Sequence, residues 1–257
     1  MKICLLGNNL TNFVLANTLA KKKIHIDIFS NSFSKSFNNS TRTIAISTDN
    51  YKFLSENIKG FNNLGWPSEK IKIFSEKKKS NELFEFKSKN KNNFYLIKYN
   101  KLITLVKKNV KYNKFIKINN SKIYNYTFLK KKFNFIINSE QNNSITKKHF
   151  FKKIEKNYKS IAYTTLLNHK KIENKTAMQI FTKRGPLAFL PLSEKQTSVV
   201  FSSDSKLIIN KKIFYDYIHK YNLKYKIKSI SDIEYFNIKF SFLRNYSFKN
   251  ILAFGDL

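Results

Sequence analysis

The first thirty residues contain the pattern that most restricts the fold. A short apolar run, Lys2–Leu6, ends at Gly7. Apolar residues at helical spacing follow over 10–22, and isoleucines then alternate with polar residues over 24–28, as they do in a strand. The pattern predicts a strand, a tight turn, a helix and a second strand.

The predicted turn occupies the place of a G-x-G-x-x-G motif, in which the backbone approaches a dinucleotide pyrophosphate at the start of a helix. Only Gly7 is a glycine, because Asn9 and Asn12 stand at the other two positions. Asparagine is the next residue to tolerate a left-handed backbone, but it carries a side chain. The second strand should end in an acid that binds ribose, and Ser30 stands there, three residues after Asp27. An ordinary strand–turn–helix would show the same pattern.

The rest of the chain alternates helices and strands and has a strand-rich middle. This pattern predicts an α/β fold, with a Rossmann-like domain and an inserted β-rich domain. We assign 1–70, 92–150 and 241–257 to the first domain, and 71–91 and 151–240 to the second. Helices are predicted over 51–58, 101–110 and 211–221. Strands or extended segments are predicted over 43–47, 71–74, 83–86, 114–117, 124–129, 133–137, 177–181, 187–192, 198–201 and 251–254.

The formal charge of +33 raises the question of a nucleic-acid partner. The basic residues are almost all lysines, and Arg42, Arg184 and Arg244 are the three arginines. Arginine forks dominate contacts with bases and phosphates, and the lysines here are spread along the chain rather than gathered in one stripe. Lysine also accompanies many asparagines, isoleucines and phenylalanines, which indicates a base-composition effect. We therefore predict no specific nucleic-acid partner, although a basic surface favours contact with an anionic membrane.

Other features restrict the compartment and the class of site. A single cysteine, Cys4, excludes an internal disulfide and fits a reducing cytoplasm, and four isolated histidines indicate no zinc site. The apolar N-terminus is interrupted by asparagines, unlike a secretory signal, and no apolar run reaches the roughly 20 residues of a membrane span. We predict a cytoplasmic protein, soluble or bound peripherally at the inner face of the membrane.

Glycine and proline are scarce, and most of them fall in a few short clusters. These are Gly65-Trp66-Pro67, Gly185-Pro186 with Pro191, and Gly255. In a chain that otherwise avoids both residues, the clusters indicate backbone positions with special geometry, although plain turns would also explain them.

Three segments around these clusters carry a resemblance to a known family. They are 42–47 with Leu64-Gly65-Trp66, then 177–182 with 185–192, and finally 251–256. Together they resemble the ubiquinone-biosynthesis FAD-dependent hydroxylases, within the para-hydroxybenzoate-hydroxylase-like flavoprotein monooxygenases. The segment Gly185-Pro186-Leu187-Ala188-Phe189-Leu190-Pro191 is the most specific of the three.

The resemblance departs from the family at two places. In the family an Asp-Gly motif contacts FAD and the nicotinamide donor, whereas Glu140 and Gln141 stand here, with Lys147 in place of an arginine. The family also continues beyond its Gly-Asp motif to a Gly-Gln-Gly turn that binds flavin, while this sequence stops at Leu257. The 257 residues correspond to about the first two-thirds of a family member, so we expect an FAD site that is incomplete at the C-terminus.

The resemblance implies a function and a set of roles. NAD(P)H would reduce FAD, and the reduced flavin would use O2 to hydroxylate the ring of a polyprenylated phenol on the path to ubiquinone, on a membrane surface or in a biosynthetic complex. The implied FAD-binding residues are Gly7, Asn9 and Asn12 at the pyrophosphate, Ser30 at the ribose, Arg42 at a phosphate or the ring edge, Glu140, and Gly255 with Asp256 at the ribityl chain. The implied substrate-lining residues are Pro186, Leu190 and Pro191.

Three alternatives stay open from the sequence. The chain could be a non-catalytic relative of this family, a flavin oxidoreductase with a soluble substrate, or a basic protein that binds nucleic acid or membrane.

Overall fold

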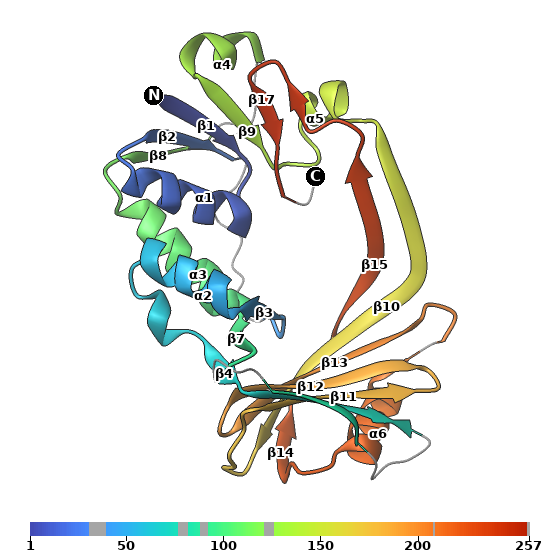
Figure 1. The fold of residues 1–257 in the computed structure, drawn as a ribbon. Helices are drawn as coiled ribbons and strands as arrows, with labels where there is room; N and C mark the ends of the chain where they lie inside the picture. The colour runs from blue at the N-terminus through green and yellow to red at the C-terminus, as the bar shows by residue number, and fades with distance from the viewer. Residues whose placement is uncertain (31–39, 77–81, 88–91, 121–125, 208, 256–257) are drawn as a thin grey trace.

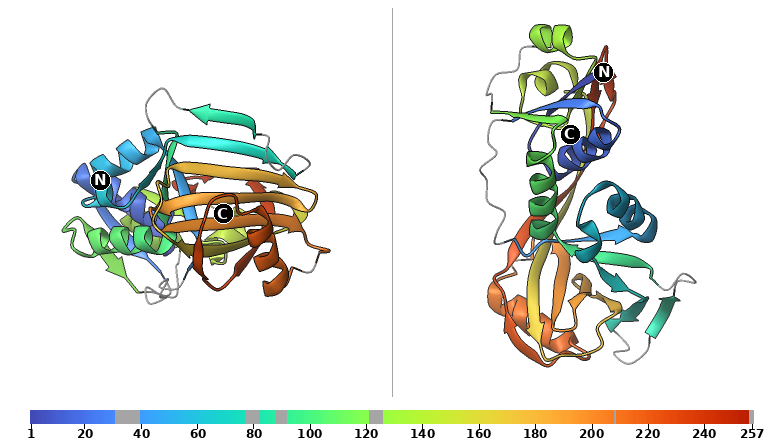
Figure 2. Two further views of the ribbon diagram at one scale, coloured as in Figure 1. Left: turned by 90° about the horizontal axis from the view of Figure 1, so that it is seen from below. Right: turned by 90° about the vertical axis from the view of Figure 1, so that its left-hand side faces the viewer.

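The computed structural model describes all residues except 31–39, 77–81, 88–91, 121–125, 208 and 256–257. The described residues form three sheets with helices packed on them, so the predicted α/β fold is confirmed. Figure 1 shows two bodies, joined along one side by the long strands β10 (Lys153–His169) and β15 (Glu234–Leu243). The side view in Figure 2 places these bodies at opposite ends of an elongated molecule.

The N-terminal body contains a sheet of six short strands: β1 (Lys2–Leu6), β2 (His25–Phe29), β8 (Ile116–Asn119), β9 (Phe135–Asn138), β16 (Ser247–Phe248) and β17 (Ile251–Ala253). Their order is β16-β17-β9-β1-β2-β8, and all neighbours are parallel except the β16–β17 edge hairpin. The chain moves from β1 to β2 on one side and returns to β9 on the other. This reversal beside β1 is the position at which open α/β sheets bind ligands.

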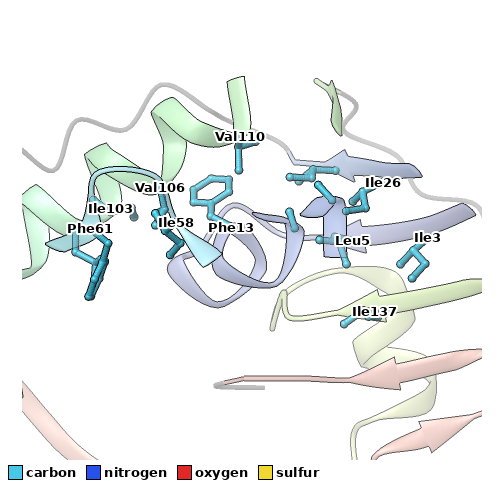
Figure 3. Close-up of a cluster of buried hydrophobic side chains, with 14 of the residues drawn as sticks. Ile3, Leu5, Phe13, Ile26, Ile58, Phe61, Ile103, Val106, Val110 and Ile137 are labelled. Carbon is cyan, nitrogen blue, oxygen red and sulfur yellow. The ribbon is translucent and has the colours of Figure 1, made fainter. Parts of the chain in front are cut away.

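One face of this sheet is covered by α1 (Leu10–Lys21) and α3 (Tyr99–Lys111). The alternation of side chains along β1 directs Leu5 to this face, where it shares a buried cluster with Phe13 and Val106 (Figure 3). All three side chains are completely buried. The burial explains why the helical spacing of apolar residues over α1 could be recognised in the sequence.

The opposite face is covered by α4 (Tyr126–Lys132) and α5 (Ser144–His149). Leu6 of β1 points to this side and shares a second buried cluster with Leu129 and Ile136. The side chains of residues 3–6 in β1 are therefore all buried, on one face of the sheet or the other. This is typical of a strand in a parallel sheet that is covered on both faces.

The sequence prediction of a strand over 124–129 is wrong for its described part, which lies in α4. Within α4 only Leu129 is buried, and three consecutive lysines, 130–132, follow it in the last turn. Lysines are favourable near the negative end of a helix dipole. The described residues of the predicted strand therefore belong to a short helix with one residue in the core.

A small antiparallel sheet and a helix pair link the two bodies: β3 (Thr43–Ser47), α2 (Thr48–Asn57), η1 (Phe61–Asn63), β4 (Trp66–Ser68) and β7 (Phe94–Lys98). The strand order is β3-β7-β4. The helix predicted over 51–58 begins three residues earlier, because the Ser47 side chain accepts a hydrogen bond from the Asn50 amide and so caps α2.

The second body is an eight-stranded sheet that consists of β10, β15 and six further strands: β5 (Lys70–Ser75), β6 (Glu82–Lys87), β11 (Thr176–Thr182), β12 (Gly185–Ser193), β13 (Gln196–Asp204) and β14 (Ile227–Ile230). The main path is β14-β10-β13-β12-β11-β5-β6, and β15 pairs with β10. Figure 2 shows this sheet from below, with α6 (Lys211–Tyr221) on its lower face. Phe214 and Ile218 of α6 pack on Phe189 and Phe201 of the sheet.

Strands β10 and β15 were not predicted from the sequence. Residues 160–168 of β10 pair with β13, and residues 160–164 also pair with β15 on their other side. Residues 153–157 pair only with β15 among the described strands. A register shift between Asn157 and Ser160 separates the two halves. Residues 154–159 of β10 and most residues of β15 are exposed, so their strand conformation comes from pairing with a distant segment rather than from a buried face.

Among the described residues, no helix combines the length and the apolar character needed to cross a membrane.

Candidate functional site

The carboxyl ends of β1, β2, β9 and β17 meet at one edge of the N-terminal sheet. The Gly7 amide donates to the Phe29 carbonyl of β2, and the Ser139 amide donates to the Leu6 carbonyl of β1. On the far side of β9, the Phe254 amide donates to the Asn138 carbonyl. The chain segments that follow these four strands are therefore held together. Because β1 lies between β2 and β9, this edge is the position at which open α/β sheets bind ligands, and we call it the crevice.

Gly7 makes the turn out of β1 with a φ of +116°, a backbone conformation that residues with side chains rarely adopt. A Cβ atom added here would lie 2.9 Å from the Ser139 hydroxyl oxygen. Both the backbone angle and the approach of the β9 loop therefore require glycine. This is the role of the first glycine in a dinucleotide turn.

Asn9 is the N-cap of α1, and its side chain makes contacts in two directions. Its Oδ1 accepts a hydrogen bond of 3.0 Å from the Asn12 amide. Its Nδ2 donates to the Ser139 hydroxyl at 2.8 Å and to the Ser139 carbonyl at 3.1 Å. We call these two contacts the Asn9–Ser139 bridge. It joins the start of α1 to the end of β9, across the crevice.

Asn12 stands where the motif has its third glycine, and its side chain is completely buried. Its Nδ2 donates to the carbonyls of Leu6 and Gly7, at 2.9 and 3.0 Å. A glycine at this position allows a helix to pack closely on the strand. Here the amide side chain instead fills the space between α1 and β1 and bonds to the strand end.

The loop after β9 is held by a buried network of side chains. Asn138 donates to the Thr146 hydroxyl at 2.7 Å and accepts from Asn143 at 2.7 Å. Asn143 caps α5 by accepting from the Thr146 amide. The Thr146 hydroxyl in turn donates to the Glu140 carbonyl at 2.6 Å. These bonds fix the backbone of Ser139 and Glu140 against the turn at Gly7.

Glu140 extends from this loop beside Gly7: its Cβ lies 3.4 Å from the position a Gly7 Cβ would take. Burial raises the pKa of the Glu140 carboxyl, and a hydrogen bond with Asn143 opposes the shift. Its Oε2 is buried without a hydrogen-bond partner among the described residues.

Gly255 completes the edge from the C-terminal side, with a φ of +80°. Its missing side chain leaves room for Thr11, because a Cβ would lie 3.3 Å from the Thr11 side chain in the first turn of α1. Ser30 is buried at the end of β2, and its amide donates to the Asn119 carbonyl. Asp256 lies outside the described residues. The structure thus brings Gly7, Asn9, Asn12, Glu140, Gly255 and Ser30 to one edge.

Arg42 lies apart from this group, at the junction of the two bodies. Its guanidinium is 5.0 Å from the centre of the Tyr99 ring and 6.0 Å from that of Phe236 on β15. Thr41 beside it donates to Glu234 of β15 and to the Thr164 carbonyl of β10, so this segment contacts both long strands. Arg42 is exposed and can reach a ligand between the bodies.

The three predicted substrate residues occupy different places along β12. Pro186 is exposed near one end of the strand and lines a shallow hollow with Tyr158 and Arg184. Leu190 is partly buried and pairs with Ser198, whose hydroxyl accepts from Thr43 of the small sheet. Leu190 therefore faces the N-terminal body. Pro191 is buried and, by alternation, shares the face of Phe189 that packs on α6. One surface therefore cannot contain both Leu190 and Pro191.

The sequence analysis missed an aromatic stripe on β15. Phe236, Ile238, Phe240 and Phe242 alternate along the strand and so share one face, and the three phenylalanines are 42–47% exposed. Phe236 lies against Arg42, and Ile154 of β10 pairs with Phe242. Alternation over 236–242 was the signal that could have revealed this strand. The sequence also gave no signal for Ser139, since its role depends on Asn9.

No protein family and no characterised protein matches this chain by sequence. Solved structures do match by fold. The chain is similar to p-nitrophenol 4-monooxygenase PnpA from Pseudomonas putida, with a TM-score of 0.75, 7% identity, and coverage of 99% of this chain and 72% of that one. It is similar to 2-methyl-3-hydroxypyridine-5-carboxylic acid oxygenase, with a TM-score of 0.74, 9% identity, and coverage of 99% and 74%.

A third similar structure is described as an FAD-containing monooxygenase from Photorhabdus luminescens. Its TM-score is 0.71 with 12% identity, and the match covers 100% of this chain and 81% of that one. At such low identity the similarity establishes the fold alone. The fold of this chain is that of the FAD-binding monooxygenases.

Proposed function

We propose that this chain is a flavin-dependent monooxygenase that hydroxylates an aromatic ring, using NAD(P)H and O2. The observation that carries the proposal is the fold match, which extends over 99–100% of the chain to structures of monooxygenases. Two of these are named for aromatic substrates, a nitrophenol and a hydroxypyridine carboxylic acid. Because the match covers the eight-stranded sheet as well as the Rossmann-like body, it favours a complete monooxygenase fold over an isolated nucleotide-binding domain.

The residues at the sheet edge fit the dinucleotide part of FAD in three respects. Gly7 has the backbone of the first motif glycine and no space for a side chain. The first turn of α1 directs its amides at the crevice, where a helix attracts phosphate. Glu140 has a buried carboxyl oxygen left for a ligand hydroxyl. The Asn9 side chain lies across the crevice, because it is bonded to Ser139.

We assign binding roles to these residues on this basis. The backbone amides of the Gly7–Asn12 turn would hold the pyrophosphate, Ser30 would contact the adenosine ribose, and Gly255 with Asp256 would contact the ribityl chain. FAD, when bound, would supply the redox chemistry between NAD(P)H, O2 and the substrate. Glu140 would accept a hydrogen bond from a ligand hydroxyl, and Arg42 would contact a flavin phosphate or the edge of the flavin ring.

The substrate that we propose is a polyprenylated phenol on the path to ubiquinone. The support is an apolar surface at the junction of the bodies: Leu190 faces the N-terminal body, and Phe236 begins the aromatic stripe of β15 beside Arg42. A ring with an isoprenoid tail would cover such residues and remove their apolar surface from water. The charge of +33 further supports a peripheral, cytoplasmic-side contact with anionic membrane, from which such a substrate would be taken, or with a biosynthetic complex.

The direct test is to purify the protein and titrate it with FAD. We expect a flavin spectrum that stays with the protein, and NADH or NADPH oxidation that increases when a prenylated phenol is added. The hydroxylated product would be identified by mass spectrometry. If the protein retains FAD but no phenol increases NADH or NADPH oxidation, the hydroxylase activity is contradicted, although the protein would still be a flavoprotein. Failure to bind FAD at all, with the fold intact by circular dichroism, would overturn the proposal.

A further inference from the structure

We infer that the Asn9–Ser139 bridge closes the dinucleotide crevice, and that the Asn9 side chain must leave Ser139 before a dinucleotide can bind. The inference rests on the proposed function, because it concerns the same crevice. It adds a residue that sets cofactor affinity through competition rather than through contact.

The bridge is fully formed in the structure. The two ends of the Asn9 amide are both used, since Oδ1 accepts from the Asn12 amide and Nδ2 donates to two oxygen atoms of Ser139. Ser139 is buried and its own amide is held by the Leu6 carbonyl. Asn9 therefore spans from the first turn of α1 to a fixed point at the end of β9.

This position is the one a pyrophosphate needs. In a doubly wound sheet the dinucleotide crosses the crevice where the strand order reverses, which is between β1 and β9 here. The phosphate bonds to amides in the first turn of the helix that follows β1. The Asn12 amide is one of these donors, and the Asn9 carboxamide oxygen already occupies it. Asn9 and a phosphate thus compete for the same amide and the same space.

The competition has a definite direction. The bonds of Asn9 are between neutral groups, whereas those of a phosphate to amides are charge-assisted and stronger. A dinucleotide can therefore displace the side chain, but its affinity is reduced by the hydrogen bonds that it breaks. Removing Asn9 leaves no buried hydroxyl without a partner, since the Ser139 hydroxyl also donates to the Leu6 carbonyl at 3.1 Å.

Two substitutions distinguish the effect of the Asn9–Ser139 bridge from that of the helix cap. Asn9→Gly removes the side chain, and glycine is accepted at an N-cap. Asn9→Ser keeps an oxygen that can cap the Asn12 amide but is too short to reach Ser139. A matched control is Asn210→Ser, because Asn210 caps α6 in the same way, through the Ile213 amide, in the other body.

The experiment is to titrate the full chain and these variants with FAD and, separately, with ADP, and to follow flavin fluorescence or binding heat. We expect Asn9→Gly to bind each ligand about tenfold more tightly than the parent, a factor within the range that the loss of neutral hydrogen bonds implies. Asn9→Ser should gain less, because its hydroxyl still caps the Asn12 amide. Asn210→Ser should bind as the parent does. Circular dichroism on each variant establishes that it is folded.

The outcomes are distinct. Equal affinity in the parent and both Asn9 variants would overturn the inference and leave the proposed flavoenzyme standing. Weaker binding in both variants would mean that Asn9 contacts the ligand, which also overturns competition. If neither FAD nor ADP binds to the parent or to any folded variant, the inference and the proposed cofactor fail together.

Discussion

The side-chain amide of Asn9 donates to both the hydroxyl and the carbonyl oxygen of Ser139, at 2.8 and 3.1 Å, although the residues are 130 positions apart. This contact connects the first helix to the loop after β9, and it lies at the one edge where the fold places its ligand crevice. The predictions below test the backbone, the charges and the surfaces around this relationship.

The first prediction concerns the close approach of Ser139 to Gly7. Gly7→Ala should lower the free energy of unfolding by about 2–3 kcal/mol, because the new Cβ meets the Ser139 hydroxyl and the φ of +116° is strained for alanine. The measurement is urea denaturation. Gly60→Ala is the control: Gly60 also has a positive φ, but its Cβ would lie 3.6 Å from Leu105, so about 1 kcal/mol is expected. Equal losses in the two variants would show that contact with Ser139 has no effect.

The second prediction concerns the pH dependence of stability at Glu140. Burial raises the pKa of its carboxyl, so the folded state disfavours the charged form. As pH rises from the unfolded pKa of about 4.5 through the folded value, this group should therefore reduce stability. Glu140→Gln should stabilise the protein at pH 7, and the gain should shrink toward pH 4. Urea midpoints at both values test this. A gain that is as large at pH 4 as at pH 7 would refute a charge effect.

The third prediction concerns Glu76, whose pKa is lowered to about 2 by the hydrogen bond from Tyr221 and then by the Lys183 amide. A lowered pKa means that the stabilisation is present above about pH 4.5 and is lost as pH falls toward 2. Tyr221→Phe should lower the free energy of unfolding at pH 7 by about 1 kcal/mol, and by less near pH 3. Tyr217→Phe, one turn earlier in α6, should show no such pH dependence.

The fourth prediction concerns Asn174, which holds the end of the β12–β13 hairpin. Its buried Nδ2 donates to the carbonyls of Ser193 and Gln196 and to the Thr197 hydroxyl, and its Oδ1 accepts from a tyrosine. Asn174→Ala should lower the free energy of unfolding by about 2–4 kcal/mol, because several buried groups lose their partners. Chemical denaturation gives the value. Asn168→Ala, at a less buried asparagine near the end of β10, should lower the free energy of unfolding by less than about 1 kcal/mol. Comparable losses in the two variants would show that the buried hydrogen bonds of Asn174 contribute no more than those of Asn168.

The fifth prediction rests on the proposed substrate. Phe236→Ala should raise KM for a prenylated phenol about tenfold, the effect of removing one apolar side chain from a buried contact, and should change KM for a short phenol little. Steady-state NAD(P)H oxidation with both substrates gives the comparison. Tyr235→Ala, on the opposite face of β15 and 70% exposed, should leave both constants unchanged. If both variants change KM for the prenylated phenol equally, the aromatic stripe is not part of the substrate site.

The N-terminal unit could be predicted because its signals are local. The apolar residues of Leu10–Lys21 recur at helical spacing over three turns, which predicts the helix. Gly7 predicts the turn, because glycine is scarce in this chain. Leu190 and Pro191 illustrate where such reasoning stops. Both were placed in a substrate surface, but the pleat of β12 sends them to opposite faces, which depends on the sheet and its partners.

Strand β10 shows a further limit. Its first half is mostly exposed and pairs with β15, some 80 residues later in the chain, so no buried pattern marks it. Helix α4 shows the reverse error, since the residues predicted as a strand form a helix with one buried side chain, Leu129.

The sequence by itself determined the strand–turn–helix at the N-terminus and the α/β class, because the periodicity of apolar residues and the position of Gly7 act within a few residues of chain. Only the tertiary structure decided what occupies the crevice. Asn9 reads from the sequence as a substitute for a missing glycine, and its side chain reaches Ser139 only because parallel pairing of β1 with β9 brings the two strand ends together. Such pairing is a long-range choice that no local pattern encodes.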